Sequence, residues 1–60
     1  MSLPEAIIAD DEKQLRIYLR SKLARLWPEL VISGEAENGH RALELIETQK
    51  PLVAFLDIKM

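Results

Sequence analysis

Carboxylates follow two short apolar runs of this chain, and they are the residues best suited to chemistry. Asp57 ends the run 52–56, and Asp10 with Asp11 follows the run 6–9. Carboxylate oxygens are the ligands that Mg²⁺ prefers, and a carboxylate can also act as a nucleophile in group transfer. Taken singly, each acid is more often a helix cap or a turn former. Their pairing after two similar runs nevertheless favours a shared site.

Hydrophobic periodicity predicts five elements that would position these acids. Strands are expected at about 6–10, 30–36 and 52–57, and helices at about 12–26 and 40–49. The alternation of strands and helices predicts an α/β fold with one parallel sheet and right-handed crossovers. The carboxyl ends of parallel strands lie at one edge of the sheet, where doubly wound folds hold their ligands. If the first and third strands are neighbours, about 4.8 Å apart, the acids are within reach of one small ion.

The same patterns predict how the elements are packed. The first helix is expected to carry an apolar stripe made of Leu15, Leu19, Leu23 and Leu26. Asp10 and Asp11 can cap this helix at its start. Gly34 lies within the predicted second strand, and an earlier strand end at this residue is the alternative, because glycine weakens a strand interior. The first and third strands are apolar at consecutive positions, which predicts that both of their faces are covered.

Composition restricts the class of protein. The 60 residues are 48% hydrophobic and 30% charged, which is a globular composition. The absence of cysteine excludes disulfides and thiolate metal sites, and a net charge of −2 gives no general attraction to nucleic acid. We expect a soluble, cytoplasmic chain without membrane contact, because the sequence has neither a signal-peptide pattern nor an apolar stretch of about 20 residues.

The length predicts that residues 1–60 are part of a domain. The chain stops three residues after Asp57, where the loop that follows the third strand should begin. A complete doubly wound sheet usually needs more than about 100 residues. We therefore expect a partial domain over residues 1–60.

Other candidate features are better explained as ordinary structure. The single His40 is expected at the surface, and Trp27 is expected to pack at the end of the first helix. Basic residues on that helix are more often solvated surface than a docking site for a partner. No glycine-rich or Walker pattern is present, so nucleotide binding has little support.

Three segments resemble the receiver domains of response regulators, the CheY-like family. They are Ile7-Ile8-Ala9-Asp10-Asp11-Glu12, Ala36-Glu37-Asn38-Gly39 and Phe55-Leu56-Asp57-Ile58-Lys59-Met60. They follow the order and spacing of that family and cover nearly the whole chain, so they are specific as a set although each is weak alone. The last segment is most similar to receivers of LytTR-type regulators. The resemblance implies a truncated flavodoxin-like fold, βαβαβ, with parallel strands in the order 2-1-3.

The resemblance also implies a role for each acid. Asp57 would be the phosphoacceptor of a two-component system, taking a phosphoryl group from the histidine of a sensor kinase or from a small phosphodonor. Mg²⁺ would be held by Asp11, Asp57 and the backbone carbonyl of Lys59, and Asp10 would act mainly through a metal-bound water. The chain would be a phosphoacceptor and not an enzyme. It would reach DNA only through an output domain that lies outside these residues.

The chain departs from the complete pattern of that family. A hydroxyl residue after a fourth strand and a lysine after a fifth strand, which respond to the phosphoryl group, would lie beyond residue 60. The Pro-Gly turn after the third strand is also missing. We therefore expect no switching by residues 1–60 alone. Two alternatives stay open, namely a non-catalytic fragment that self-associates through its exposed third strand, and a degenerate receiver that only binds partners.

Overall fold

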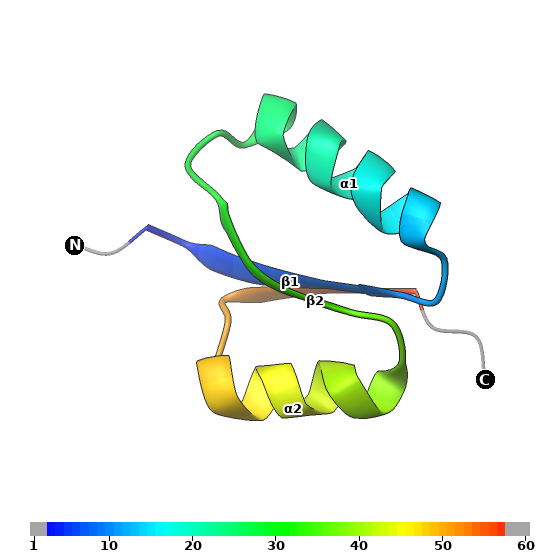
Figure 1. The fold of residues 1–60 in the computed structure, drawn as a ribbon. Coiled ribbons are helices and arrows are strands. Elements are labelled where there is room, and N and C mark those ends of the chain that lie inside the picture. Colours follow the sequence, from blue (N-terminus) through cyan, green and yellow to red (C-terminus); the bar gives the residue numbers. More distant parts are fainter. Residues whose placement is uncertain (1–2, 58–60) are drawn as a thin grey trace.

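Three parallel strands and two helices form this chain, which is described over residues 3–57 in a computed structural model. The elements are β1 (Glu5–Asp10), α1 (Lys13–Leu26), β2 (Val31–Ala36), α2 (Gly39–Gln49) and β3 (Val53–Asp57). The sheet has the order β2-β1-β3, and both strand pairs are parallel. Figure 1 shows α1 on one face of the sheet and α2 on the other. This arrangement confirms the predicted α/β fold with strand order 2-1-3.

The last residue of each of the five elements agrees with the prediction, whereas the first residue of each differs from the prediction by one position. β1 and α2 start one residue earlier, whereas α1, β2 and β3 start one residue later. The start of α2 has a clear cause. Asn38 is its N-cap residue, and the Asn38 side chain accepts a hydrogen bond from the Arg41 amide at 2.8 Å. This contact satisfies one of the backbone donors that a helix leaves free in its first turn.

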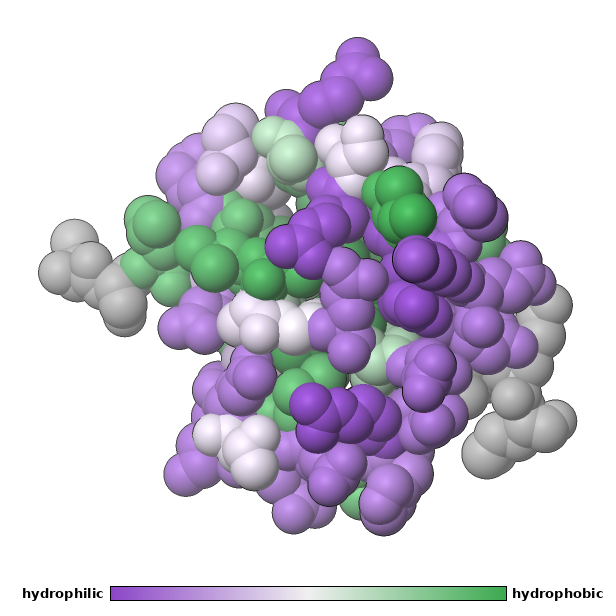
Figure 2. Space-filling model, in the orientation of Figure 1, coloured by the Kyte–Doolittle hydropathy of each residue, from purple (hydrophilic) through white to green (hydrophobic). Residues whose placement is uncertain are grey.

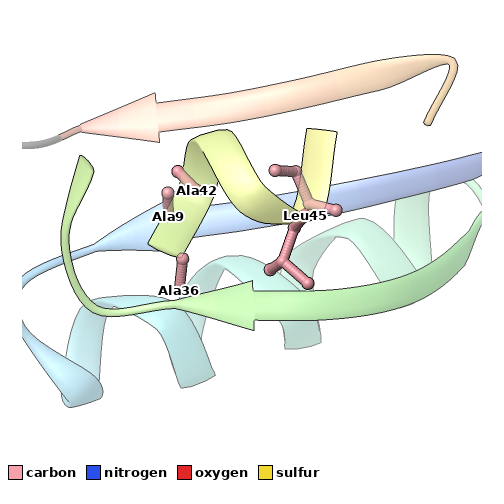
Figure 3. Close-up of a cluster of buried hydrophobic side chains, with 5 residues drawn as sticks. Ala9, Ala36, Ala42 and Leu45 are labelled. Atoms are coloured by element: carbon pink, nitrogen blue, oxygen red, sulfur yellow. The ribbon is translucent and has the colours of Figure 1, made fainter. Parts of the chain in front are cut away.

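The main hydrophobic core lies between the sheet and α2. Its buried residues come from β1, β2 and α2, and they are Ile7, Ala9, Ala36, Ala42 and Leu45. Ile46 packs against this cluster from the same helix and is partly buried. Figure 3 shows Leu45 and Ala42 of α2 turned towards Ala9 and Ala36 on the strands. The small alanines allow the helix to approach the sheet closely, so a short helix can still bury apolar area.

The opposite face of the sheet is covered less completely. Ala6, Ile8 and Leu30 are buried, but α1 itself contributes no buried residue. Of the predicted apolar stripe of α1, Leu19 and Leu23 are half-buried, whereas Leu15 and Leu26 are exposed. The predicted stripe is therefore partly covered only in its middle. Trp27 is half-buried at the C-cap of α1, where its amide donates to the Leu23 carbonyl.

Gly34 lies inside β2, as the predicted strand 30–36 implies, so the alternative of a strand end at this residue was wrong. The pairing of β1 with β2 shifts by one residue, because Ala6 is opposite Ile32 whereas Ile7 is opposite Gly34. A Cβ atom on Gly34 would come within 3.1 Å of Leu45 Cδ1. Glycine thus leaves room here for the close approach of the Leu45 side chain, and it does not serve as a strand terminator.

β3 pairs with β1 and is one of the two edge strands of the described sheet. Its two faces are not both covered, since Val53 and Phe55 are half-buried but Ala54 and Leu56 are exposed. The expectation of a strand covered on both faces was therefore wrong for β3, although it holds for β1. Between α2 and β3, the C-cap residue Lys50 has a left-handed backbone with φ of 47°.

The surface is mostly hydrophilic over the two helices. Figure 2 shows polar residues over most of both helices on the viewed side, with hydrophobic residues at the level of the sheet between them. Neither helix within residues 3–57 has the length and hydrophobicity that a bilayer-spanning segment requires.

Candidate functional site

Two of the predicted acids lie directly opposite each other at the carboxyl ends of neighbouring strands. Asp10 is the last residue of β1, Asp57 is the last residue of β3, and the two are register partners. Because neighbouring strands lie about 4.8 Å apart, the register brings the two Cα atoms close together. Side chains alternate along a strand, and Ile7 and Ala9 face α2, so Asp10 and its partner Asp57 belong to the face covered by α1.

Asp10 is the buried member of the acidic site. Only 7% of its surface is exposed, and its Oδ1 accepts a hydrogen bond from the Glu12 amide at 2.8 Å. This contact closes the turn between β1 and α1. The N-cap residue of α1 is Glu12, so the expectation that Asp10 or Asp11 caps the helix was wrong. Asp10 instead stabilises the turn that leads into the helix.

The other two acids are accessible. Asp11 lies in the turn directly after β1 and is exposed, and Asp57 is exposed at the end of β3. One buried carboxylate with a fixed hydrogen bond therefore stands beside two carboxylates that solvent can reach. A nucleophile must be accessible to its substrate, and Asp57 meets this condition whereas Asp10 does not.

The oxygen-rich character of the site fits a hard divalent cation. Mg²⁺ takes oxygen ligands, needs only one or two carboxylates from the protein and keeps several waters. Asp10 retains acceptor capacity beyond its bond to Glu12, since an ionised carboxylate offers about four lone-pair positions. Residues 3–57 contain no preassembled group of three metal-binding side chains. Lys59, whose backbone carbonyl was predicted as a ligand, lies outside the described residues.

Three charged residues near this site were not singled out from the sequence, namely Arg16, Arg20 and Glu35. Arg16 of α1 donates through Nη1 to the backbone carbonyl of Asp10 at 2.7 Å and through Nε to Glu35 of β2 at 3.4 Å. Arg20, one turn further along α1, also pairs with Glu35. The sequence does contain a signal for these contacts. Arg16 and Arg20 are four residues apart and so share a helix face, and Glu35 is the single acid within the segment Val31–Ala36.

A surface hollow borders the acidic site and shares Arg16 and Glu35 with it. A hollow at the carboxyl end of β2 is lined by Glu35, Glu37, Asn38, His40, Arg41 and Glu44 together with Arg16. It contains both signs of charge, and Arg41 is paired with Glu44 on the same helix at 3.5 Å. His40 is exposed at the start of α2, as the sequence predicts.

Relatives of this chain include two proteins named as regulators and one named as a methylesterase/glutaminase. The chain is 54% identical over 55 residues to an uncharacterized response regulatory protein of Vibrio cholerae, covering 92% of this chain and 21% of that protein. It is 48% identical over 60 residues to protein-glutamate methylesterase/protein-glutamine glutaminase 1 of Carboxydothermus hydrogenoformans, covering 100% of this chain and 17% of the relative. It is 41% identical over 54 residues to transcriptional regulatory protein PdtaR of Mycobacterium tuberculosis, covering 90% and 25% respectively.

The chain thus spans a quarter or less of the length of these three relatives. No family model matches it, and no solved structure matches it. None of the three names specifies a LytTR-type regulator, so that part of the resemblance stays a prediction.

Proposed function

Because this chain belongs to the receiver domains of response regulators, we propose that it accepts a phosphoryl group at Asp57 in a Mg²⁺-dependent reaction. The observation that carries the proposal is the register of β1 with β3, which places Asp10 opposite Asp57 at one end of the sheet. Asp57 is exposed and can reach a phosphodonor, whereas Asp10 is buried and held by the Glu12 amide. This division suits one acid that reacts and one that supports the site.

In the proposed reaction, a carboxylate oxygen of Asp57 attacks the phosphorus atom of the donor. The new O–P bond forms an aspartyl phosphate while the bond from phosphorus to the leaving group breaks, and the leaving nitrogen or oxygen keeps the electron pair. Bound Mg²⁺ would neutralise charge on the transferring phosphoryl group. Asp11 and Asp57 are the carboxylates that would hold the ion directly with the Lys59 carbonyl, and Asp10 would contact it through water.

The partners of the whole protein follow from the same proposal. A sensor histidine kinase is the expected donor, which implies a cytoplasmic protein, and a small phosphodonor is the alternative source. The chain itself would be a phosphoacceptor and not an enzyme. Any contact with DNA would come from an output domain outside residues 1–60, and any switching would need the hydroxyl and lysine positions of a complete receiver.

Phosphorylation of the longest native protein that carries this chain tests the proposal. The protein is incubated with acetyl phosphate, with and without MgCl₂, and the modified residue is located by mass spectrometry. We expect modification of Asp57 only with Mg²⁺ and none in Asp57→Asn. Glu37→Gln, which removes an exposed acid at the carboxyl end of β2, serves as the matched control and should be modified normally. Absence of modification with Mg²⁺ present contradicts the proposal and favours a degenerate receiver that only binds partners.

The exposed edge of the sheet supports a second proposal, self-association of the isolated 60-residue chain. Leu56 is 58% exposed and Leu52 is 72% exposed, beside a strand that has only one neighbour in the described sheet. Pairing of two β3 strands would satisfy their backbone groups and remove these side chains from water. The free energy gained is about 25 cal/mol for each Å² of apolar surface buried.

Sedimentation velocity at micromolar concentration tests self-association. We expect a dimer or larger species of the isolated chain, and a shift towards monomer in Leu56→Lys, because a charge on an edge strand opposes pairing. Leu43→Lys changes a similarly exposed leucine on α2 and is the matched control. A folded monomer of the unmodified chain would rule this proposal out.

A further inference from the structure

Arg16 connects three elements at the acidic end of the sheet. It belongs to α1, its Nη1 donates to the carbonyl oxygen of Asp10 in β1 at 2.7 Å, and its Nε donates to Glu35 of β2 at 3.4 Å. Its side chain is only 14% exposed, whereas the side chain of Arg20, which pairs with the same glutamate, is 52% exposed. Of these two arginines, Arg16 is the one that donates a hydrogen bond to the backbone of an acidic residue, Asp10.

The carbonyl that Arg16 contacts belongs to the peptide that joins Asp10 to Asp11. A hydrogen bond to that oxygen restrains the peptide plane, and the plane sets the direction in which the Asp11 side chain leaves the backbone. The Asp10 carboxylate is held by the Glu12 amide on the other side of the same turn. The turn is thus restrained at both ends, once by its own amide and once by α1.

The charge of Arg16 adds a second effect at the same place. Three carboxylates at one sheet end repel one another, and a guanidinium against the adjacent carbonyl offsets part of that repulsion. A hydrogen bond from a charged donor is also roughly twice as strong as one between neutral groups. Glu35 in turn fixes the guanidinium, since it accepts from Arg16 Nε and also pairs with Arg20.

We propose that Arg16 is a positioning residue of the magnesium site, because it holds the Asp10–Asp11 peptide in the orientation that lets Asp11 bind the ion. This inference rests on the proposed function, since it assumes that Asp11 is a ligand. Outer residues that orient metal ligands typically contribute about 10–100-fold to metal affinity. Arg16 acts through a backbone carbonyl, so we expect a loss near the lower end of that range.

Titration of the longest native protein with MgCl₂, followed by the NMR shifts of the Asp11 and Glu12 amides, measures the affinity directly. We expect Arg16→Gln to weaken Mg²⁺ binding about tenfold. Arg20→Gln also removes a partner of Glu35 but leaves the Asp10 carbonyl contact in place, so its affinity should equal that of the unmodified protein. Arg16→Lys keeps a charged donor but lacks the planar guanidinium that can contact two acceptors at once. Its Mg²⁺ affinity should lie between those of Arg16→Gln and the unmodified protein.

The Arg16 and Arg20 side-chain resonances of the unmodified protein provide a measurement that needs no variant. The Arg16 Nε–H signal should shift with the same Mg²⁺ midpoint as the Asp11 amide, and the Arg20 Nε–H signal should not. Equal affinities of Arg16→Gln and Arg20→Gln, or an Arg16 signal that does not respond to Mg²⁺, would overturn the inference while leaving the metal site intact. If the unmodified protein binds no Mg²⁺ at all, the proposed function fails together with this inference.

Discussion

The two helices cover opposite faces of one sheet, but they are attached by different interactions. α2 places Ala42 and Leu45 in the buried cluster of the sheet. α1 contributes no fully buried residue, although Leu19 and Leu23 are half-buried. Arg16 and Arg20 of this helix also form hydrogen bonds with the sheet. Both faces of the sheet therefore bury apolar side chains, and the α1 face adds charged hydrogen bonds between helix and sheet.

The difference separates stability from site geometry. Apolar burial depends on area and has no preferred direction, so it contributes stability without fixing any one group. Charged hydrogen bonds contribute less stability near the surface, but they fix positions and are weakened by salt. We infer that the α2 face stabilises the fold, whereas the α1 face sets the arrangement of the acids at the end of β1.

Removal of the central leucine of the α2 face should have the largest effect. Leu45→Ala should lower the free energy of unfolding by about 2–5 kcal/mol, because it leaves a cavity in the buried cluster. Urea denaturation of the purified protein measures the change. Leu43→Ala on the same helix is the control, since Leu43 is exposed and its loss should cost about 0.5 kcal/mol or less. Similar losses for the two variants would show that α2 is not held by this cluster.

Addition of one methyl group to the same face should have the next largest effect. Gly34→Ala should cost about 1–3 kcal/mol, because the new Cβ would lie 3.1 and 3.3 Å from the two Leu45 methyl carbons. In Gly34→Ala combined with Leu45→Ala, the loss measured by denaturation should be smaller than the sum of the single losses, since the shorter side chain makes room. Strict additivity would mean that the two positions are not in contact.

Loss of the N-cap of α2 should cost about 1 kcal/mol in Asn38→Ala. The Asn38 side chain accepts the Arg41 amide hydrogen bond at 2.8 Å, and alanine cannot replace this acceptor. Asn38→Asp retains an acceptor and is the matched control. Thermal denaturation should rank the unmodified protein and Asn38→Asp together, above Asn38→Ala, and the reverse order would contradict the cap.

The smallest effect is expected on the α1 face. Arg20→Gln should cost about 0.5 kcal/mol or less, because Arg20 is half exposed and ion pairs near the surface are largely screened. The loss of unfolding free energy is measured by denaturation at about 50 mM and about 1 M NaCl, because salt screens ion pairs near the surface. The loss caused by Arg20→Gln should vanish at the higher salt concentration. A loss as large as that of Leu45→Ala would remove the contrast between the two faces.

Much of the fold was predictable because β1 and α2 carry patterns that local physics determines. β1 is apolar at consecutive positions and is buried, and Ala42 with Leu45 recurs at helical spacing and is buried. How completely each face of β3 and of α1 is buried was not predictable from the sequence. The apolar residues of β3 and of α1 indicate surfaces that favour burial, but a pattern does not reveal which neighbour supplies the cover, and Leu26 and Leu56 are exposed among the described residues.

The acidic residues of the candidate site were predictable from the sequence, but the arginine that hydrogen-bonds to their backbone was not. Asp10 and Asp57 each follow an apolar run, so the pairing of their strands was enough to bring them together. The contact between Arg16 and the Asp10 carbonyl depends on how far α1 rotates about its own axis over the sheet. A basic residue on a helix is usually solvated, so its identity alone does not reveal such a contact.

The register shift in β2 has a consequence for insertions and deletions. Ser33 is the extra residue of this strand, since Ala6 is opposite Ile32 and Ile7 is opposite Gly34. Its hydroxyl donates to the Ala6 carbonyl at 3.3 Å. A chain lacking Ser33 could keep every other pair of the ladder in place, with Gly34 still towards α2. Loss of a residue between Gly34 and Ala36 would instead move the side chains at the end of the strand to the opposite face of the sheet. A homologue shorter by one residue in β2 is therefore best aligned with its gap at Ser33.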